Sequence, residues 1–358
     1  MKRIILFLLF IIITYGNVHS QSDQGKSGES KFTFKGNIFG DFFLKAGGDS
    51  TGNNLQYSPY VKDFNAFAFR RVNFGVNYKF NRNFDSWFSL SYDGPDTLPD
   101  GNIGVLVKDA FVRWTNVLPR TNMLLGIMPT PAYSFTSERW WSYRSVEKTI
   151  MDQRGIVSSR DFGFMVSGVF DEQSDFGYYA MIGNGSGNKI EQNKYKKVYA
   201  TLFGNFLEKN LLASFYTDYS SSGGNKSKTT LNNFVGYKND FISIGIENFF
   251  QINSNFNTSA NAESSDIVPY GLSVFISQNI ISDELNYFLR YDYFNQDINN
   301  SNTGFYQSFM TAGLDITPAP DVHIMPNIWL NAFTPKPLQN AKYTTDVVPR
   351  ITFWYEYK

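Results

Sequence analysis

The sequence predicts an all-β fold: a transmembrane antiparallel up-and-down β-barrel of about 16 strands with a long third outer loop. Three observations predict it: an export signal at the start of the chain, a two-residue alternation of apolar and polar side chains, and a high aromatic content. Aromatic residues make up 18% of the chain, yet its mean hydropathy is −0.29. A membrane barrel combines these two values because its strands turn apolar side chains to lipid and polar ones to the lumen.

The first twenty residues are expected to be a cleaved signal peptide. Lys2 and Arg3 supply a positive start, and an apolar run follows over residues 4–15. That run is shorter than the roughly 20 residues that a transmembrane helix needs. Small or permissive side chains at 18–20 place the cleavage before Gln21. The predicted organisation is a signal peptide (1–20), a flexible polar leader (21–30) and an outer-membrane β-barrel (31–358).

The alternation of side chains is clearest in three segments. From Arg71 to Phe80, apolar residues at even positions alternate with polar residues and glycine at odd positions. The same two-residue period runs through 242–251 and 286–293. Such a period indicates a strand with one face exposed to water and the other in an apolar environment. Ten residues is also about the length that a tilted strand needs to cross a bilayer.

Applied to the whole chain, this alternation predicts sixteen strands. They are expected at 31–45, 65–80, 83–92, 104–115, 121–128, 159–170, 174–184, 194–206, 209–219, 230–238, 240–252, 268–279, 283–295, 305–317, 321–332 and 345–357. Short connections then alternate with long ones, and the long ones are 46–64, 93–103, 129–158, 185–193, 220–229, 253–267, 296–304 and 333–344. Tight periplasmic turns with longer outer loops are typical of outer-membrane barrels. In lipid an unpaired strand edge has no water to bind, so the sheet must close.

One residue conflicts with this assignment. Pro326 lies inside the fifteenth predicted strand, where a proline removes a hydrogen bond from the ladder. Either a bulge lies at Pro326 or that strand boundary is wrong.

Composition and motifs exclude several classes of function. Without Lys2 and Arg3 the chain has 30 basic and 32 acidic residues, so it has no bulk attraction to nucleic acid. It has no cysteine, and His323 is its only histidine after the signal peptide. No nucleophile motif or ligand spacing surrounds His323, so we expect no enzyme, no metal site and no cofactor. An energised transporter needs an N-terminal plug domain, for which the ten-residue leader leaves no room.

The longest internal connection, 129–158, carries most of the non-strand motifs. The segment around it resembles the phosphate-selective porin O/P family over about residues 65–190, whereas the C-terminal half matches only in strand style. The matching motifs are Phe69-Arg70-Arg71, Phe80-Asn81-Arg82-Asn83-Phe84, Asp109-Ala110-Phe111, Gly126 to Pro131, Arg160 to Gly163 and Asn184-Gly185-Ser186-Gly187. The resemblance implies a trimeric 16-stranded porin whose third outer loop folds inward and narrows the channel.

The charges of this loop leave two interpretations open. A narrow passage of low dielectric focuses the field of its lining charges, and guanidinium groups suit phosphate and carboxylate. The candidate residues for a constriction that contacts anions are Arg139, Arg144, Lys148, Arg154 and Arg160 of the loop, with Arg71 and Lys79 of a neighbouring strand. Glu138, Glu147 and Asp152 lie among them, so the ion pairs could instead cancel and only position the loop.

The tryptophan pair of the loop also has two readings. Trp140 and Trp141 could form a platform on which a sugar stacks, or they could simply pack the loop.

Two functions from different classes remain. The first is a porin in the cell outer membrane for passive diffusion of small hydrophilic solutes, with anions such as phosphate as candidates. Its expected partners are outer-membrane lipid, the solutes, the barrel-assembly machinery and two further copies in a homotrimer. The alternative is a barrel closed by its own loops that acts as a surface binding or structural protein.

Overall fold

The computed structural model describes residues 32–51, 53, 55–94, 98–257 and 265–357. The predicted signal peptide and polar leader lie outside these residues. In the part of the chain that is described, no helix has both the length and the apolar character to cross a membrane.

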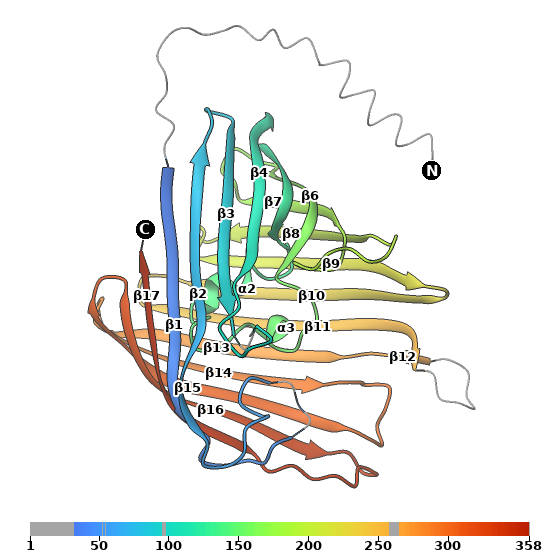
Figure 1. Cartoon of the computed structure of the whole chain (residues 1–358). Helices are drawn as coiled ribbons and strands as arrows, with labels where there is room; N and C mark the ends of the chain where they lie inside the picture. Colours follow the sequence, from blue (N-terminus) through green and yellow to red (C-terminus); the bar gives the residue numbers. More distant parts are fainter. Residues whose placement is uncertain (1–31, 52, 54, 95–97, 258–264, 358) are drawn as a thin grey trace, which may run out of the picture.

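Within the described ranges, sixteen strands form one closed antiparallel barrel, and β1 pairs with β17 to close it (Figure 1). A further short strand, β12, pairs only with β11 at the barrel rim. The strands are β1 (Phe32–Leu44), β2 (Asn65–Lys79), β3 (Phe84–Asp93), β4 (Leu106–Leu118), β5 (Thr121–Pro129), β6 (Arg160–Val169), β7 (Phe176–Gly183), β8 (Lys197–Phe206), β9 (Leu211–Gly223), β10 (Lys226–Lys238), β11 (Ile242–Asn257), β12 (Ser265–Ile267), β13 (Tyr270–Ile281), β14 (Leu285–Asn295), β15 (Phe305–Ala319), β16 (Val322–Pro335) and β17 (Asp346–Tyr357). Each predicted strand overlaps one of the barrel strands, so the predicted fold class is confirmed.

The predicted outer loop 220–229 is wrong. β9 and β10 stay paired up to Gly223 and Lys226, and only two residues turn between them. Gly223 and Gly224 have positive φ angles of 91° and 60°, which glycine adopts readily in a tight turn. The prediction failed because side chains here are polar on both faces, so the alternation ends before the hydrogen-bonded ladder does.

Pro326 lies within β16, so its assignment to a strand is right, and no bulge lies at this residue. Pro326 pairs with Ile351 of β17. Towards β15, the ladder pairs Asn327 and Ile324 and skips Pro326 between them. The proline is tolerated because one of its two ladders is interrupted at the point where its missing N–H would be needed.

The two faces of the barrel differ as the alternation predicted. On β11, Ile244 and Ile246 are 40% and 47% exposed on the outside, whereas Glu247 is 2% exposed on the lumen side. The exposed apolar side chains belong to strands all around the ring. A closed sheet with no free edge and an apolar exterior is the arrangement that hydrocarbon requires.

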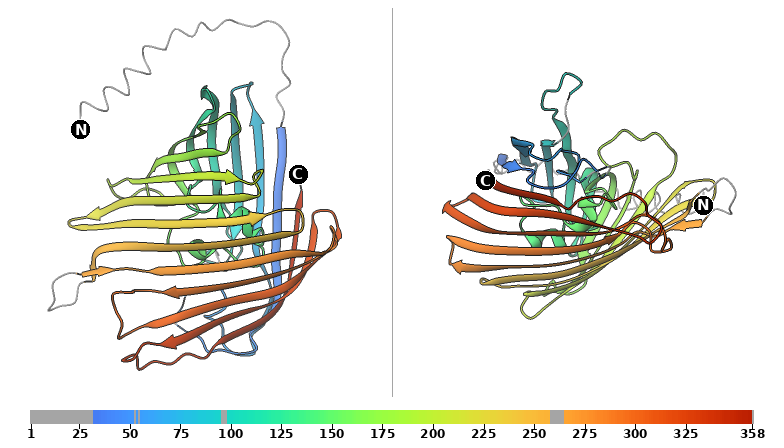
Figure 2. Two further views of the ribbon diagram at one scale, coloured as in Figure 1. Left: turned by 180° about the vertical axis from the view of Figure 1, so that it is seen from behind. Right: turned by 90° about the horizontal axis from the view of Figure 1, so that it is seen from below.

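The third outer connection folds into the barrel. This inner loop, residues 130–159, contains the short helices α2 (Ser137–Trp141) and α3 (Ile150–Gln153), which lie inside the ring of strands (Figures 1 and 2). Its Tyr133, Ile150 and Met151 are fully buried against the barrel wall. The inward course that the family resemblance implied is therefore confirmed.

The first loop, the described residues between Leu44 and Asn65, also turns inward, although it was expected to be an outer connection. Its Tyr57 is 1% exposed and packs against Trp329 and Phe43 of the wall. The anchor of the loop is Lys45, whose ammonium is fully buried. It lies 2.8 Å from Asp346 Oδ1 and donates to the carbonyl oxygens of Asp49, Tyr57 and Ser58 at 3.0–3.1 Å.

Replacing Lys45 with methionine is expected to release the first loop. The substitution leaves the buried carboxylate of Asp346 without its cation, a change that costs about 3–5 kcal/mol in comparable buried pairs. Urea unfolding in detergent micelles and limited proteolysis of the loop would measure the effect. Lys35→Met, at an exposed position on β1, is the matched control. Equal unfolding midpoints and digestion rates for the two variants would refute this role of Lys45.

Candidate pore constriction

Two β-bulges place consecutive charged residues on the lumen side of the wall. Where β1 pairs with β2, Phe39 faces Arg71 and Gly40 faces Phe69, so Arg70 is an extra residue. Where β3 pairs with β4, Lys108 is an extra residue in the same way. A bulge interrupts the two-residue period, so neighbours can share a face. Arg70 and Arg71 both line the lumen, as do Lys108 and the residue after it.

The wall cations are joined to carboxylates. Arg71 Nε lies 2.7 Å from Asp93 Oδ1, and the ammonium of Lys108 pairs with the same carboxylate. On β6, Arg160 Nε lies 2.5 Å from Oδ1 of Asp109. The wall of β2, β3, β4 and β6 thus presents three cations that share two carboxylates.

The inner loop carries its own compensated charge. Arg144 lies between Asp152, at 2.6 Å from Oδ2, and Glu138, at 3.2 Å from Oε2. Burial alone would raise the pKa of Asp152, but the positive charges of Arg144 and Lys148 outweigh it and lower that pKa to about 2. Arg144 therefore holds the loop together through ion pairs, as the second interpretation of the loop charges predicted for this residue.

Arginines from three strands hold the inner loop by its backbone. Arg70 Nη1 donates to the carbonyl oxygens of Ser145 and Val146, both at 2.7 Å. Arg350 Nη2 of β17 also donates to the carbonyl of Val146, at 2.5 Å. Arg290 Nη1 of β14 donates to the carbonyl of Lys148, at 2.5 Å. Charge-assisted hydrogen bonds of this kind are stronger than neutral ones, so this part of the loop is fixed to the wall.

Glu147 is the acidic counterpart of these arginines. Its side chain is buried, and Oε2 accepts a hydrogen bond from Trp329 Nε1 at 2.8 Å. Oε1 lies 3.6 Å from Arg70 Nη2. Burial alone would raise the pKa of Glu147, but the charges of Arg70 and Arg350 outweigh it and lower the pKa. The carboxylate therefore stays ionised, and its negative charge helps to hold the loop against the arginines of the wall.

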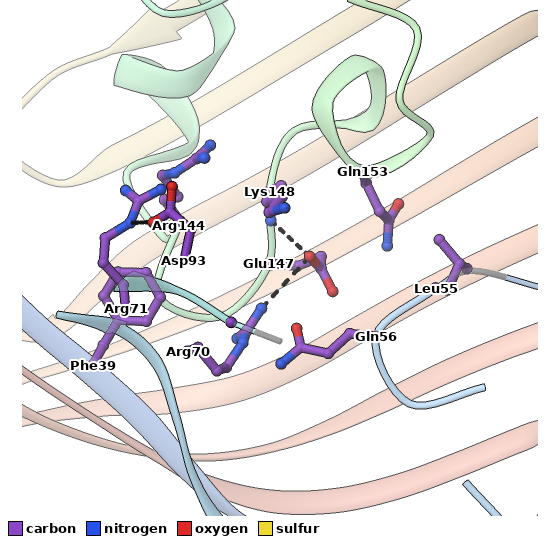
Figure 3. A pocket seen from close by; sticks show the side chains of 11 residues that line it. Phe39, Leu55, Gln56, Arg70, Arg71, Asp93, Arg144, Glu147, Lys148 and Gln153 are labelled. Carbon is purple, nitrogen blue, oxygen red and sulfur yellow. Dashed lines mark hydrogen bonds and ion pairs between the residues drawn. The ribbon is translucent and has the colours of Figure 1, made fainter. Parts of the chain in front are cut away.

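Three cavities lie in series between the wall and the two inward loops. The middle cavity has a volume of about 110 Å³ and is lined by Phe39, Leu55, Gln56, Arg70, Arg71, Asp93, Gly94, Arg144, Glu147, Lys148 and Gln153 (Figure 3). It shares Phe39, Arg71 and Arg144 with a second cavity of about 370 Å³, here called the Arg160 cavity. It shares Leu55 and Gln153 with a third of about 340 Å³, here called the Arg154 cavity. The smallest volume is in the middle, so it is the candidate constriction.

The lining of the three cavities is more basic than acidic. Its basic residues are Arg70, Arg71, Lys108, Arg139, Arg144, Lys148, Arg154 and Arg160. Its acidic residues are Asp93, Asp109, Glu138, Glu147 and Asp152. Lys148 is distinct because it lines the middle cavity while its ammonium makes no hydrogen bond or ion pair with any residue that the structure describes. The dashed line at Lys148 in Figure 3 is the hydrogen bond from its backbone N–H to Glu147 Oε1, at 2.9 Å.

Six of the seven residues predicted from the sequence line these cavities. Arg71, Arg144 and Lys148 line the middle one, Arg139 and Arg160 line the Arg160 cavity, and Arg154 lines the third. Lys79 lines none of them and lies at the end of β2, opposite Asp85. Sequence reasoning missed Arg70, Lys108, Arg290 and Arg350.

Trp141 of the tryptophan pair and His323 are both held by packing and polar contacts with neighbouring side chains and backbone. Trp141 is 1% exposed, and its Nε1 donates to the carbonyl of Glu147 at 2.8 Å, so the packing interpretation is confirmed for this residue. His323 Nδ1 lies 2.7 Å from Asp315 Oδ1, and its ring contacts Trp354 edge-on. Among the described residues, no group of three or more His, Cys, Asp or Glu could hold a metal ion.

Comparison with known proteins gives a clear result for the fold. No family model matches the chain, and no curated protein does. The solved structure of the outer-membrane channel DcaP of Acinetobacter baumannii is similar, with a TM-score of 0.66 at 12% identity over 93% of this chain and 99% of that one. OmpT of Vibrio cholerae matches with a TM-score of 0.62 at 12% identity over 93% and 99%. OmpF of Salmonella typhi, in complex with daunomycin, matches with a TM-score of 0.61 at 12% identity over 92% and 98%.

Identities this low establish shared architecture, and membership of the phosphate-selective O/P family stays a prediction. The agreement over nearly the whole length of each neighbour, together with the closed ring of strands, gives this chain the same closed, sixteen-stranded antiparallel β-barrel fold as these outer-membrane proteins.

Proposed function

We propose that this chain is an outer-membrane porin through which small hydrophilic solutes diffuse passively. The observation that carries the proposal is the series of three adjoining cavities inside the barrel, of which the smallest lies between the inner loop and the basic wall. The apolar exterior suits a bilayer, and a solved neighbour with the same fold is described as an outer-membrane channel. The signal peptide over 1–20 would bring the chain to the periplasm, where the barrel-assembly machinery inserts such proteins.

The lining of the passage supports a preference for anions, with phosphate as a candidate. Eight basic and five acidic residues line the cavities. A narrow passage with low-dielectric walls focuses their field. Arg71 and Lys148 both line the middle cavity, one from the wall and one from the inner loop (Figure 3). An anion in this cavity would meet guanidinium and ammonium groups together, and both bind phosphate well.

The oligomer proposed for this porin is a homotrimer. A structure of in-vitro folded OmpT of Vibrio cholerae, which has the same fold, is a trimer form. A trimer would bury part of the apolar outer wall against identical walls, in keeping with the cyclic symmetry that membrane assemblies use.

One observation favours the second candidate, a barrel closed by its own loops. The middle cavity, at about 110 Å³, has about a third of the volume of either of its neighbours. If the lumen is blocked at this point, the barrel excludes solutes and acts as a surface protein instead. The two candidates therefore differ in whether current flows at all.

Planar-bilayer recording of the folded protein separates them. The porin predicts a steady ohmic conductance, with a reversal potential shifted towards anions in a potassium chloride gradient. Replacement of chloride by phosphate tests the phosphate preference directly. Silent membranes with protein whose barrel is folded would reject the porin and leave the closed barrel.

A further inference from the structure

The Arg154 cavity, of about 340 Å³, contains a cation that pairs with no described carboxylate. Among the described residues that line it, Arg154 is the only basic one, and it makes no ion pair with any residue that the structure describes. Asp152 also lines the cavity, but its carboxylate is bound to Arg144 at 2.6 Å. The charge of Arg154 is therefore not balanced by a partner within its own cavity.

The contacts of Arg154 fix its guanidinium and leave one edge of that group unused. Its Nη1 donates to Gln307 Oε1 at 2.6 Å, an oxygen that also accepts from Asn53 Nδ2 at 2.9 Å. Its Cζ lies 4.9 Å from the centroid of the Phe294 ring. Nε and Nη2 are buried and have no hydrogen-bond partner among the described residues. These two nitrogens form an edge whose N–H bonds run parallel, and such an edge binds a carboxylate through two hydrogen bonds.

Burial makes the missing partner of Arg154 costly. It lowers the pKa of the guanidinium to about 10, although Asp292 and Glu147 act on that pKa in the opposite direction from a distance. Asp292 already pairs with Arg290 at 2.5 Å, on the barrel wall. Glu147 already pairs with Arg70 at 3.6 Å. An anion in the cavity would supply the charge that these side chains do not.

Gln153 adds a donor and an acceptor to the same cavity. It lies next to Arg154 at the end of α3, and its side chain is drawn in Figure 3. Its Nε2 and Oε1 are both buried, and neither has a hydrogen-bond partner among the described residues. A hydroxyl group both donates and accepts hydrogen bonds, so it can pair with either atom of this carboxamide.

We propose that the Arg154 cavity binds a small hydroxy acid, with the carboxylate on Arg154 and the hydroxyl on Gln153. The carboxylate takes two parallel hydrogen bonds from Nε and Nη2, the fork for which the guanidinium is suited. One cation matches the single charge of a carboxylate, whereas a phosphate dianion brings a second charge that no other cation of the described lining would balance. The inference adds a solute class to the proposed function. It rests on that function only for the later step in which the solute leaves the cavity through the channel.

Calorimetric titration of the folded barrel in detergent with lactate tests the site without any need for conduction. Propionate is the matched ligand, because it has the same charge and lacks the hydroxyl, and inorganic phosphate tests the anion class. Lactate is expected to bind more tightly than either. Arg154→Met should weaken lactate binding by at least about tenfold, because it removes charge-assisted hydrogen bonds. Gln153→Leu should lower the affinity for lactate to that for propionate, and Lys79→Met, outside the three cavities, should leave both affinities unchanged.

Arg154→Lys keeps the charge and removes the planar fork, so it should bind lactate with an affinity between those of the wild type and Arg154→Met. It also serves as the test if the methionine variant does not fold. Absence of binding at millimolar lactate in the wild type, or equal binding in the wild type and both Arg154 variants, would overturn the proposal. Phosphate bound as tightly as lactate would overturn the assignment to a hydroxy acid. Silent bilayers together with lactate binding that depends on Arg154 would reject the porin and support the site.

Discussion

Replacing Glu147 with alanine is expected to free the inner loop from the barrel wall and to widen the pore. The substitution removes the acidic partner of Arg70 on the loop, so that only Asp41 of β1, 3.5 Å from its Nε, still balances its charge, and it removes the acceptor of Trp329 Nε1. Breaking a buried pair by removing one partner costs about 3–5 kcal/mol, because the remaining charge stays desolvated. The backbone carbonyls of Val146 and its neighbours then compete with water for the wall arginines. Single-channel conductance should rise well above that of the wild type, with larger fluctuations of the open level.

The matched control for this variant is Trp329→Phe. It removes one hydrogen bond to Glu147 but leaves the contact with Arg70 and most of the ring packing. A single hydrogen bond to a charged group contributes about 1.5–3 kcal/mol, so the loop should stay in place for most of the time. Equal conductance in the alanine variant and the wild type, with the loop still protected from protease, would contradict the role given to Glu147.

Replacing Lys148 with glutamate is expected to reverse the ion preference of the channel. The ammonium lines the smallest cavity and makes no hydrogen bond or ion pair among the described residues, so its replacement breaks no such bond and removes only its longer-range attraction for Asp152. At about 5 Å and an effective dielectric constant of about 20, each unit charge changes the energy of a passing ion by about 3 kcal/mol. Even after screening by salt, the ratio of anion to cation permeability should fall by at least about tenfold, equivalent to about 1.4 kcal/mol. Reversal potentials in a potassium chloride gradient measure this ratio.

Lys79→Glu makes the same change of charge outside the three cavities. Lys79 lies at the end of β2, so the reversal potential of the Lys79→Glu channel should stay close to that of the wild type. A shift in Lys79→Glu as large as that in Lys148→Glu would mean that overall charge, and not the middle cavity, sets the preference.

The strands could be predicted because one physical condition acts on all of them. Each strand has hydrocarbon on one side and water or polar groups on the other, and the side chains record that difference every second residue. The pairs Ile244 with Glu247 and Ile246 with Ser243 illustrate it, since the isoleucines face out and the polar residues face in. Beyond the apolar belt the condition no longer holds, which is why the extension of β9 to Gly223 and of β11 to Asn257 was missed.

The bulges explain why part of the basic wall was missed. Alternation assigned Arg71 to the lumen and, by the same rule, placed Arg70 outside. One inserted residue reverses this parity, and a bulge has no reliable signature in a single sequence. The double arginine itself was the available signal, because a charged residue at an outward position would be costly in lipid. Lys108, next to Asp109, carried the same signal on β4.

The loop contacts could not be predicted because they join residues far apart in the chain. No pattern in the sequence pairs Glu147 with Trp329 or Val146 with Arg350, because about two hundred positions separate the members of each pair. It did show basic and acidic residues mixed in the inner loop. The structure assigns them different roles, since Arg144 is bound by two carboxylates whereas Lys148 faces the cavity without a partner among the described residues.

Thiol modification of Lys148→Cys during single-channel recording tests the central claim most directly, namely that the passage through the lumen is narrowest beside the inner loop. The chain has no other cysteine, so an anionic methanethiosulfonate reagent attaches at this one position. An open channel should lose most of its current within one modification event, and a reducing agent should restore it. A current that is unchanged after complete modification, verified by mass, would show that ions do not pass beside Lys148.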